Sequence, residues 1–302
     1  MNKVTLITHE SDFTSFNSYY LTPLFNKYFD LTTYDGISKY DPKSSVVVIG
    51  CFNQSNFWYQ PLVDAGIKVV VDNLWERDKV NKFTNVLTLL NQNWMWYNDA
   101  LWWKSLNYDT YIPNKKYTHT AFMPMRLEKP HRTQLISKLA PYLSDMIYSY
   151  VAKNIFLPND IDIDAGIFQR YFNPEWYDNT YYSIVSETLI DTGSILVSEK
   201  TFKPIAFRHP FMIAGQQNIL SYIKKLGFET FENLFDESYD TEYNYYARLS
   251  LIENNVKNFQ RTPYNNITLE KLEHNHNLFF DIAKINKCII QEVIFPVLDY
   301  VT

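Results

Sequence analysis

Glycine is scarce in this chain, with 7 glycines among 302 residues. No two of them form a Gly-x-Gly pair, and none begins a Gly-x-x-x-x-Gly-Lys segment. The sequence therefore has neither the dinucleotide-binding fingerprint nor a P-loop, the glycine-rich motifs that hold phosphates with backbone amides. A phosphate group bound by this protein must be held by side chains and helix N-termini.

Cysteine and long apolar runs are also missing. The only cysteines, Cys51 and Cys288, are far apart and lie beside apolar segments, which indicates buried thiols and argues against a disulfide framework or a cysteine zinc site. No apolar run reaches membrane-spanning length, and residues 1–7 have the pattern of a strand rather than of a signal peptide. We therefore expect a cytoplasmic protein without a membrane span.

The chain also has no excess of positive charge: it contains 28 Lys and Arg residues and 33 Asp and Glu residues, which gives a net charge of −5. This balance argues against a surface built wholly for nucleic acid, although it leaves room for a local basic groove. Hydrophobic residues make up 46% of the chain and charged residues 20%, which is a globular composition. The length suits one large domain or two of ordinary size.

Short apolar segments alternate with helix-length segments along the first third of the chain. We expect strands at residues 4–8, 46–50, 68–72 and 86–91, and a helix at residues 14–29. This alternation predicts a parallel sheet with crossover helices, and ligands of such sheets bind beyond the carboxyl ends of the strands. That rule puts several carboxylates on the ligand-binding edge, among them Glu10, Asp72 and Glu76.

A second alternation follows a stretch without periodicity around residues 110–125, where we expect the domain junction. Strands are predicted at residues 146–152, 181–186 and 211–214, separated by helices. We therefore predict an α/β protein with two Rossmann-like domains. The N-terminal domain is residues 1–118, the C-terminal domain is residues 119–268, and a helical tail at residues 269–302 packs across the junction.

Charged residues gather at strand ends in the C-terminal half. Residues 182–187 end in Glu187, and residues 196–204 contain Ser198, Glu199, Lys200 and Lys203. Glu187 or Glu199 could accept hydrogen bonds from ribose or sugar hydroxyls. Lys200 and Lys203 could neutralise the charge on a departing diphosphate, beside a helix N-terminus capped by Ser198 or by Thr201. The alternative is an exposed Glu199–Lys203 pair on an ordinary surface helix.

These segments, with residues 209–215 that end in glycine, resemble the donor-binding region of the α1,3-fucosyltransferase family and of related exostosin-like and phage glycosyltransferases. In that family a strand ends in Glu, a Thr/Ser-Glu-Lys element starts a helix, and a strand with a terminal Gly follows. The resemblance covers roughly residues 120–240. It implies a GT-B fold of two facing Rossmann-like domains, with a nucleotide-sugar bound in the C-terminal half. The chain departs from fucosyltransferases at residues 203–204 and 208–210, so the sugar is not specified.

Residues 125–133 form a basic cluster where the family keeps a phosphate-binding arginine. Arg126 or Arg132 could make a bidentate contact with the diphosphate, and a solvated basic linker is the alternative. Trp94, just past a predicted strand, could stack on an acceptor sugar ring or an extruded base, although most neighbouring tryptophans fit a core.

Alternating aspartates at positions 160, 162 and 164 are similar to the Asp-x-Asp metal motif of GT-A transferases. A loop signal at residues 157–159 precedes them, and no strand leads into them, so the pattern favours a solvated loop. The six histidines show no useful metal-ligand spacing. We therefore assign no metal and no cofactor beyond the nucleotide-sugar co-substrate.

The expected reaction is an inverting, metal-independent hexosyl or pentosyl transfer. A carboxylate deprotonates an acceptor hydroxyl, which displaces the nucleoside diphosphate at the anomeric carbon. Asp72 is the expected base, with Glu76 and Glu10 as alternates. The acceptor is a glycan or other polyol, or alternatively viral DNA with a hydroxymethylated base. A third hypothesis is a non-catalytic binding module with a GT-B-like fold. Surface positions of Glu199 and Lys200, outside any cleft, would favour this hypothesis.

Metal independence gives a first prediction. Sugar transfer persists in excess EDTA, because lysine and arginine side chains meet the charge on the leaving group. The measurement is the transfer rate with and without EDTA. Complete loss of transfer that manganese restores would instead assign Asp160, Asp162 and Asp164 as metal ligands.

Overall fold

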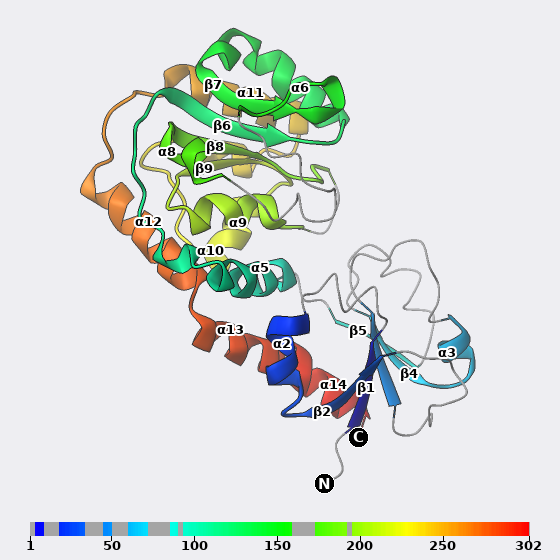
Figure 1. The fold of residues 1–302 in the computed structure, drawn as a ribbon. Coiled ribbons are helices and arrows are strands. Elements are labelled where there is room, and N and C mark those ends of the chain that lie inside the picture. Colours follow the sequence, from blue (N-terminus) through cyan, green and yellow to red (C-terminus); the bar gives the residue numbers. More distant parts are fainter. Residues whose placement is uncertain are drawn as a thin grey trace. The chain divides into compact units, whose positions relative to one another are not determined.

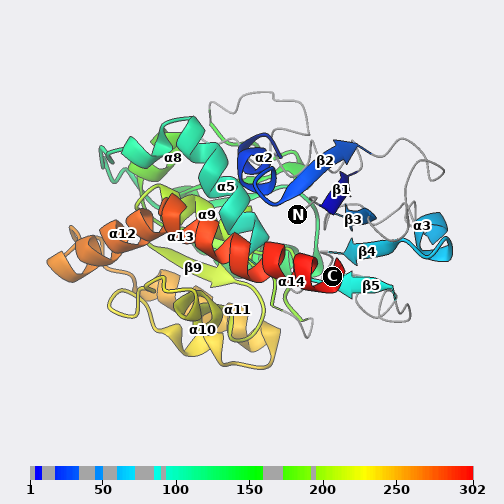
Figure 2. The same ribbon diagram turned by 90° about the horizontal axis from the view of Figure 1, so that it is seen from below.

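The computed structural model describes residues 4–8, 18–33, 45–49, 60–71, 85–89, 93–158, 173–191 and 195–301 (Figures 1 and 2). The chain divides into two compact units, the first made of residues 1–102 and 281–302 and the second of residues 103–280. The division therefore differs from the predicted one. The boundary falls after residue 102 instead of 118, and the predicted tail of residues 269–302 is shared between the units.

The first unit contains a parallel sheet in the order β2-β1-β3-β4-β5. Its strands are β1 (Val4–Thr8), β2 (Phe29–Thr33), β3 (Ser45–Ile49), β4 (Lys68–Val71) and β5 (Val86–Thr88). Its helices are α2 (Ser18–Phe25), α3 (Gln60–Asp64), α5 (Trp94–Ser105), α13 (Ile282–Ile289), the π-helix η6 (Ile290–Ile294) and α14 (Phe295–Val301). The predicted strands are confirmed, but β2 was not predicted: its first residue, Phe29, was assigned to the preceding helix and residues 30–33 were assigned to no element.

Two polar contacts explain why the C-terminal segment belongs to the first unit. Lys68, at the start of β4, donates from Nζ to the carbonyls of Tyr300 and Val301, at 2.9 Å each. The hydroxyl of Tyr97, in α5, donates to the carboxylate of Glu292 at 2.9 Å. Both contacts join residues nearly 200 or more positions apart, so the last helices pack on the sheet formed by the first part of the chain.

The second unit contains a parallel sheet in the order β7-β6-β8-β9. Its strands are β6 (His119–Met125), β7 (Met146–Tyr150), β8 (Thr180–Ser186) and β9 (Phe211–Ala214). Its helices are α6 (Pro130–Leu139), α8 (Pro174–Asp178), α9 (Glu199–Ala206), α10 (Ile219–Lys225), α11 (Tyr245–Asn258) and α12 (Asn266–Phe279), with 3₁₀ turns η2 (Tyr108–Thr110), η3 (Ala140–Asp145), η4 (Val151–Lys153) and η5 (Glu237–Asp240).

The structure corrects two predictions for this half of the chain. Strand β6 occupies part of the predicted junction, and it accommodates Pro124 because its pairing with β8 ends two residues earlier, at Phe122. The predicted continuous helix of the tail is interrupted between α12 and α13. Asp281 lies at this break, where its carboxylate accepts a hydrogen bond from the backbone amide of Lys284 at 2.9 Å and so caps a new helix.

The crossover connections place helices on both faces of the second sheet. The connection from β6 through α6 to β7 and the connection from β8 through α9 to β9 run in opposite directions along the sheet. Right-handed crossovers therefore put α6 and α9 on opposite faces. Helix α11 packs beside α6, and Figure 2 shows α9 and α11 on opposite sides of β9.

Aromatic side chains form much of the core under α9. The ring of Phe202 is fully buried and stacks on Phe279 with centroids 5.8 Å apart, and Trp103 packs against the other side of Phe279 at 5.4 Å. Every residue of β8 is buried, as expected for a parallel strand covered on both faces.

Two smaller expectations can be compared with the described residues. Cys288, in α13, is partly exposed rather than buried, while Cys51 lies outside the described residues. No helix of the described part combines the length and the apolar character that crossing a membrane requires.

Truncation of Phe202 tests the core under α9. We expect Phe202→Ala to lower the free energy of unfolding of the second unit by about 3–5 kcal/mol, because the change leaves a cavity between packed rings. Phe156→Ala is the matched control, since that ring is 59% exposed, and it changes stability by less than about 1 kcal/mol. The measurement is denaturant unfolding, and equal effects of the two variants would contradict the described packing.

Candidate functional site

The topology of the second sheet identifies the place where a ligand is expected. Strands β6 and β8 are neighbours, and the chain leaves their carboxyl ends in opposite directions. In open α/β sheets such a switch point forms a crevice in which ligands bind. Arg126 follows β6 and Glu187 follows β8, so the predicted donor-site segments meet at this point.

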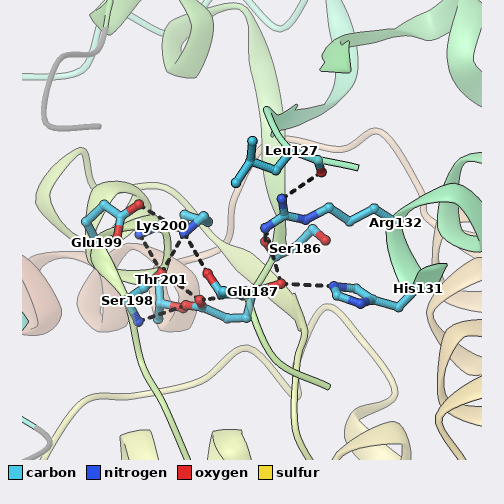
Figure 3. Close-up of polar contacts among 10 residues, drawn as sticks. Leu127, His131, Arg132, Ser186, Glu187, Ser198, Glu199, Lys200 and Thr201 are labelled. Atoms are coloured by element: carbon cyan, nitrogen blue, oxygen red, sulfur yellow. Dashed lines mark hydrogen bonds and ion pairs between the residues drawn. The ribbon is translucent and has the colours of Figure 1, made fainter. Parts of the chain in front are cut away.

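The carboxylate of Glu187 lies at the centre of this site and is completely buried (Figure 3). Its Oε1 accepts hydrogen bonds from the amide of Ser198 at 3.0 Å and from the hydroxyl of Thr201 at 2.7 Å. Its Oε2 accepts from the hydroxyl of Ser198 at 2.6 Å and from the amide of Thr188 at 3.3 Å. Both oxygens are therefore used within the protein, and Glu187 positions the start of α9. A direct contact with a ribose or sugar hydroxyl does not fit this arrangement.

The main chain of Glu187 connects the same point to α6. Its carbonyl oxygen lies 3.0 Å from Nε2 of His131 and accepts a hydrogen bond from the guanidinium of Arg132 at 3.3 Å. Burial lowers the pKa of His131, so the imidazole is neutral and donates from Nε2 to this carbonyl. One residue thus joins β8, α6 and α9.

Helix α9 begins at Glu199 and is capped by Ser198, which resolves the choice between Ser198 and Thr201. The Ser198 hydroxyl accepts a hydrogen bond from the amide of Lys200 at 3.4 Å, while Thr201 lies in the first turn and donates to Glu187. Pro204 therefore lies in the second turn and supplies no amide to the carbonyl four residues earlier.

Lys200 and Glu199 form an ion pair at the start of α9. The ammonium group of Lys200 donates to the Glu199 carboxylate at 2.9 Å, to the Ser198 hydroxyl at 3.0 Å and to the Thr188 hydroxyl at 3.3 Å. The side chain of Glu199 is 9% exposed and that of Lys200 is 26% exposed. The alternative interpretation, an exposed pair of Glu199 with Lys203 on a surface helix, is therefore wrong, because Glu199 is buried and pairs with Lys200.

The two groups hold each other in their charged forms. Burial lowers the pKa of Lys200, but the carboxylates of Glu199 and Glu187 outweigh this effect and raise the pKa above its ordinary value. Burial raises the pKa of Glu199, but the ammonium groups of Lys200 and Lys203 outweigh it and lower that pKa. A charged ammonium group is thus fixed beside the positive end of a helix.

The two predicted arginines differ in their surroundings. Arg132 is buried, and its guanidinium donates to the carbonyls of Leu127 at 3.0 Å, Ser186 at 3.2 Å and Glu187 at 3.3 Å. A bidentate contact of Arg132 with a diphosphate would require these bonds to break. Arg126 is only partly buried and lies directly after β6, at the same edge of the sheet.

Other predicted residues are not part of the described site. The expected bases Glu10, Asp72 and Glu76 lie outside the described residues, as do Asp160, Asp162 and Asp164. Trp94 is the first residue of α5, and its side chain is not described. Within the described ranges, no group of three or more His, Cys, Asp or Glu side chains is arranged to hold a metal ion.

Thr188 and His131 organise the site but were not predicted from the sequence, and Thr201 was predicted only as a possible helix cap. Thr188 contacts both Glu187 and Lys200, Thr201 donates to Glu187, and His131 holds the Glu187 carbonyl. Thr188 and Thr201 each adjoin an assigned residue, and His131 adjoins Arg132, so proximity in sequence was the available signal. A cavity of about 460 Å³ lined partly by His119 and Met146 lies at the opposite, amino ends of β6 and β7, away from this site.

Comparisons with known proteins give a likeness in structure only. No protein-family model matches the sequence, and no curated protein matches it. A crystal structure of an α1,3-fucosyltransferase matches with a TM-score of 0.50 at 12% identity, over 96% of this chain and 91% of that chain. An α1,3-fucosyltransferase with GDP-fucose gives 0.47 at 9% identity, over 96% and 91%, and one with GDP gives 0.41 at 10% identity, over 94% and 90%. The first match confirms the predicted α/β fold of the GT-B class.

Replacement of the central carboxylate tests the architecture of the site. We expect Glu187→Gln to lower the free energy of unfolding by roughly 1–3 kcal/mol, because an amide nitrogen then faces donors that had a carboxylate oxygen as acceptor. Glu270→Gln, on the exposed surface of α12, is the matched control and leaves stability nearly unchanged. Thermal and denaturant unfolding measure both, and wild-type stability of Glu187→Gln would show that these bonds do not hold α9.

Proposed function

We propose that this protein is a glycosyltransferase that uses a nucleotide-sugar donor and binds the donor diphosphate beside Lys200 at the start of α9. The observation that carries the proposal is the ammonium group of Lys200. It is charged and donates to three oxygen atoms, and the Lys200 side chain is still one-quarter exposed at the switch point of a GT-B fold.

The chemistry of a diphosphate suits this position. Charge accumulates on the phosphate oxygens as the bond to the sugar breaks, and a fixed ammonium group beside a helix N-terminus stabilises that charge without reorganising. Lys203 lies one turn along α9, and Arg126 follows the neighbouring strand, so both add positive charge near the same edge. The positive charge of these side chains supports a reaction that proceeds without a divalent cation.

The proposed reaction follows from the departure of the diphosphate. The acceptor oxygen forms a bond to the anomeric carbon while the bond from that carbon to the phosphate oxygen breaks, which inverts the configuration. The acceptor proton passes to a carboxylate, for which Asp72 is our first candidate and Glu76 and Glu10 are the alternates. The nucleoside diphosphate leaves toward Lys200.

The substrates are proposed at the level of chemical class. One structural neighbour is an α1,3-fucosyltransferase, and its likeness to this chain concerns the fold. We propose a hexose or pentose donor and a glycan or polyol acceptor, with DNA carrying a hydroxymethylated base as the alternative acceptor. The buried Glu199 and the partly buried Lys200 do not have the open surface positions that a non-catalytic module would favour.

A donor screen tests the function directly. A ligand that binds the native state raises the melting temperature, by an amount that grows with the ratio of its concentration to its Kd. We expect at least one member of a series of UDP-, GDP-, ADP- and CMP-sugars to raise the melting temperature and to release its nucleotide when acceptor is added. The absence of any shift across the series would contradict the proposal.

Substitution of Lys200 tests its role. We expect Lys200→Ala to lower kcat by roughly 10²–10³-fold, because it removes charge that stabilises the leaving group in the transition state. Lys225→Ala, an exposed lysine of α10, is the matched control and keeps wild-type turnover. Lys200→Arg keeps the charge and the partner of buried Glu199, so it separates loss of charge from loss of folding. Near-normal turnover in a folded Lys200→Ala variant would remove Lys200 from the mechanism.

A further inference from the structure

Three tyrosines gather around the start of α11, outside the site described above. Tyr243 is 86% exposed and Tyr246 is 51% exposed. The rings of Tyr245 and Tyr246 are stacked, with centroids 4.0 Å apart and planes at 28°. Single exposed aromatic residues are common on protein surfaces, but a stacked pair with a third exposed tyrosine two residues before it in the chain is less common. We call these three residues the tyrosine platform.

Hydrogen bonds to the backbone anchor the segment that carries the tyrosine platform. Asn244 caps α11 and accepts hydrogen bonds from the amides of Tyr246 at 2.9 Å and Ala247 at 3.3 Å. The buried guanidinium of Arg248 donates to the carbonyl of Glu242 at 2.8 Å and to that of Tyr243 at 3.3 Å. The rings are therefore presented by an anchored segment.

Arg248 also ties this segment to the ligand-binding edge of the sheet. It donates to the carbonyl of Ile190 at 3.1 Å, in the loop after β8, and to the carbonyl of Gly215, directly after β9. Gly215 lies so close to Glu187 that a Cβ atom on it would be 3.4 Å from the Glu187 Cβ. The guanidinium group of Arg248 thus links the backbone of Tyr243 to Gly215, which packs against Glu187.

A second connection runs through α6. Gln134 donates from Nε2 to the hydroxyl of Tyr245 at 3.5 Å. Gln134 lies one helical turn, about 5 Å, along α6 from His131, which holds the Glu187 carbonyl. Two chains of contacts, one through Arg248 and one through Gln134 and α6, therefore connect the platform to the surroundings of Glu187.

We propose that the tyrosine platform binds the nucleobase of the nucleotide-sugar donor by stacking, with Tyr246 as the contacting ring. The proposal rests on the proposed function, because it takes the diphosphate to lie at Lys200. A nucleobase is flat and presents a π-face, and aromatic side chains stack on such faces whatever the base. The rings of Tyr245 and Tyr246 are already nearly parallel, so a base adds one more layer to the stack.

The test separates the base from the phosphates. Isothermal titration measures the Kd of UDP, GDP, ADP and CDP, and of inorganic pyrophosphate, for the wild-type protein and for Tyr246→Ala. We expect Tyr246→Ala to weaken the best nucleoside diphosphate roughly 5- to 150-fold, which corresponds to the strength of base–aromatic stacking. Pyrophosphate affinity stays unchanged. Tyr246→Phe keeps the ring and keeps wild-type affinity for both.

The outcomes distinguish this proposal from the function on which it rests. Wild-type protein that binds neither a nucleoside diphosphate nor pyrophosphate overturns both. Nucleoside diphosphate binding that Tyr246→Ala and Tyr245→Ala leave unchanged overturns the platform alone, and so does an equal loss for pyrophosphate. If the alanine variants instead lose affinity only for a methyl glycoside, the platform binds a sugar ring and the proposal is wrong. Melting temperatures of the variants confirm that each is folded.

Discussion

The geometry of the candidate site depends on one buried carboxylate. A charged group removed from water is costly unless hydrogen bonds and opposite charges offset that cost. Glu187 meets this requirement with four donors from Thr188, Ser198 and Thr201, and with the charges of Arg132 and Lys200 nearby. Because these donors come from the start of α9 and from the loop after β8, satisfying the carboxylate also fixes where α9 begins. Lys200 takes its position from that helix start.

Two buried guanidinium groups have a comparable role at the same edge of the sheet. Arg132 joins the carbonyls after β6 and β8, and Arg248 joins those after β8 and β9 to the segment before α11. The terminal nitrogens of both groups donate to backbone oxygens, so both groups shape these loops. Lys200 differs from them, because its side chain is partly exposed and can contact an anion if the protein binds one as proposed.

Sequence reasoning predicted that the residues of the candidate site lie close together, but it did not predict the contacts that each of them makes. Strand patterns and the topology of parallel sheets were enough to place Glu187, Ser198, Glu199 and Lys200 at one edge. They were not enough to show that Glu187 is saturated, because its partners Ser198 and Thr201 lie 11 and 14 residues further along and reach it only through the fold. Local pattern also failed at β6. The sequence around residues 110–125 shows no periodicity and predicted a domain junction, but residues 119–125 form a strand whose pairing with β8 ends at Phe122, before Pro124.

The scarcity of glycine has a physical consequence for phosphate binding. Without a glycine-rich loop, the backbone amides nearest to a phosphate are those in the first turn of α9, and some are already engaged. The Ser198 amide donates to Glu187, and the Lys200 amide donates to the Ser198 hydroxyl. Side-chain charge must then supply most of the attraction. Salt screens charges over about 8 Å, so the net charge of −5 on the whole chain does not prevent an anion from approaching Lys200. Under the proposed function, the local positive charge of Lys200 and Lys203 therefore matters more for phosphate binding than the overall charge of the protein.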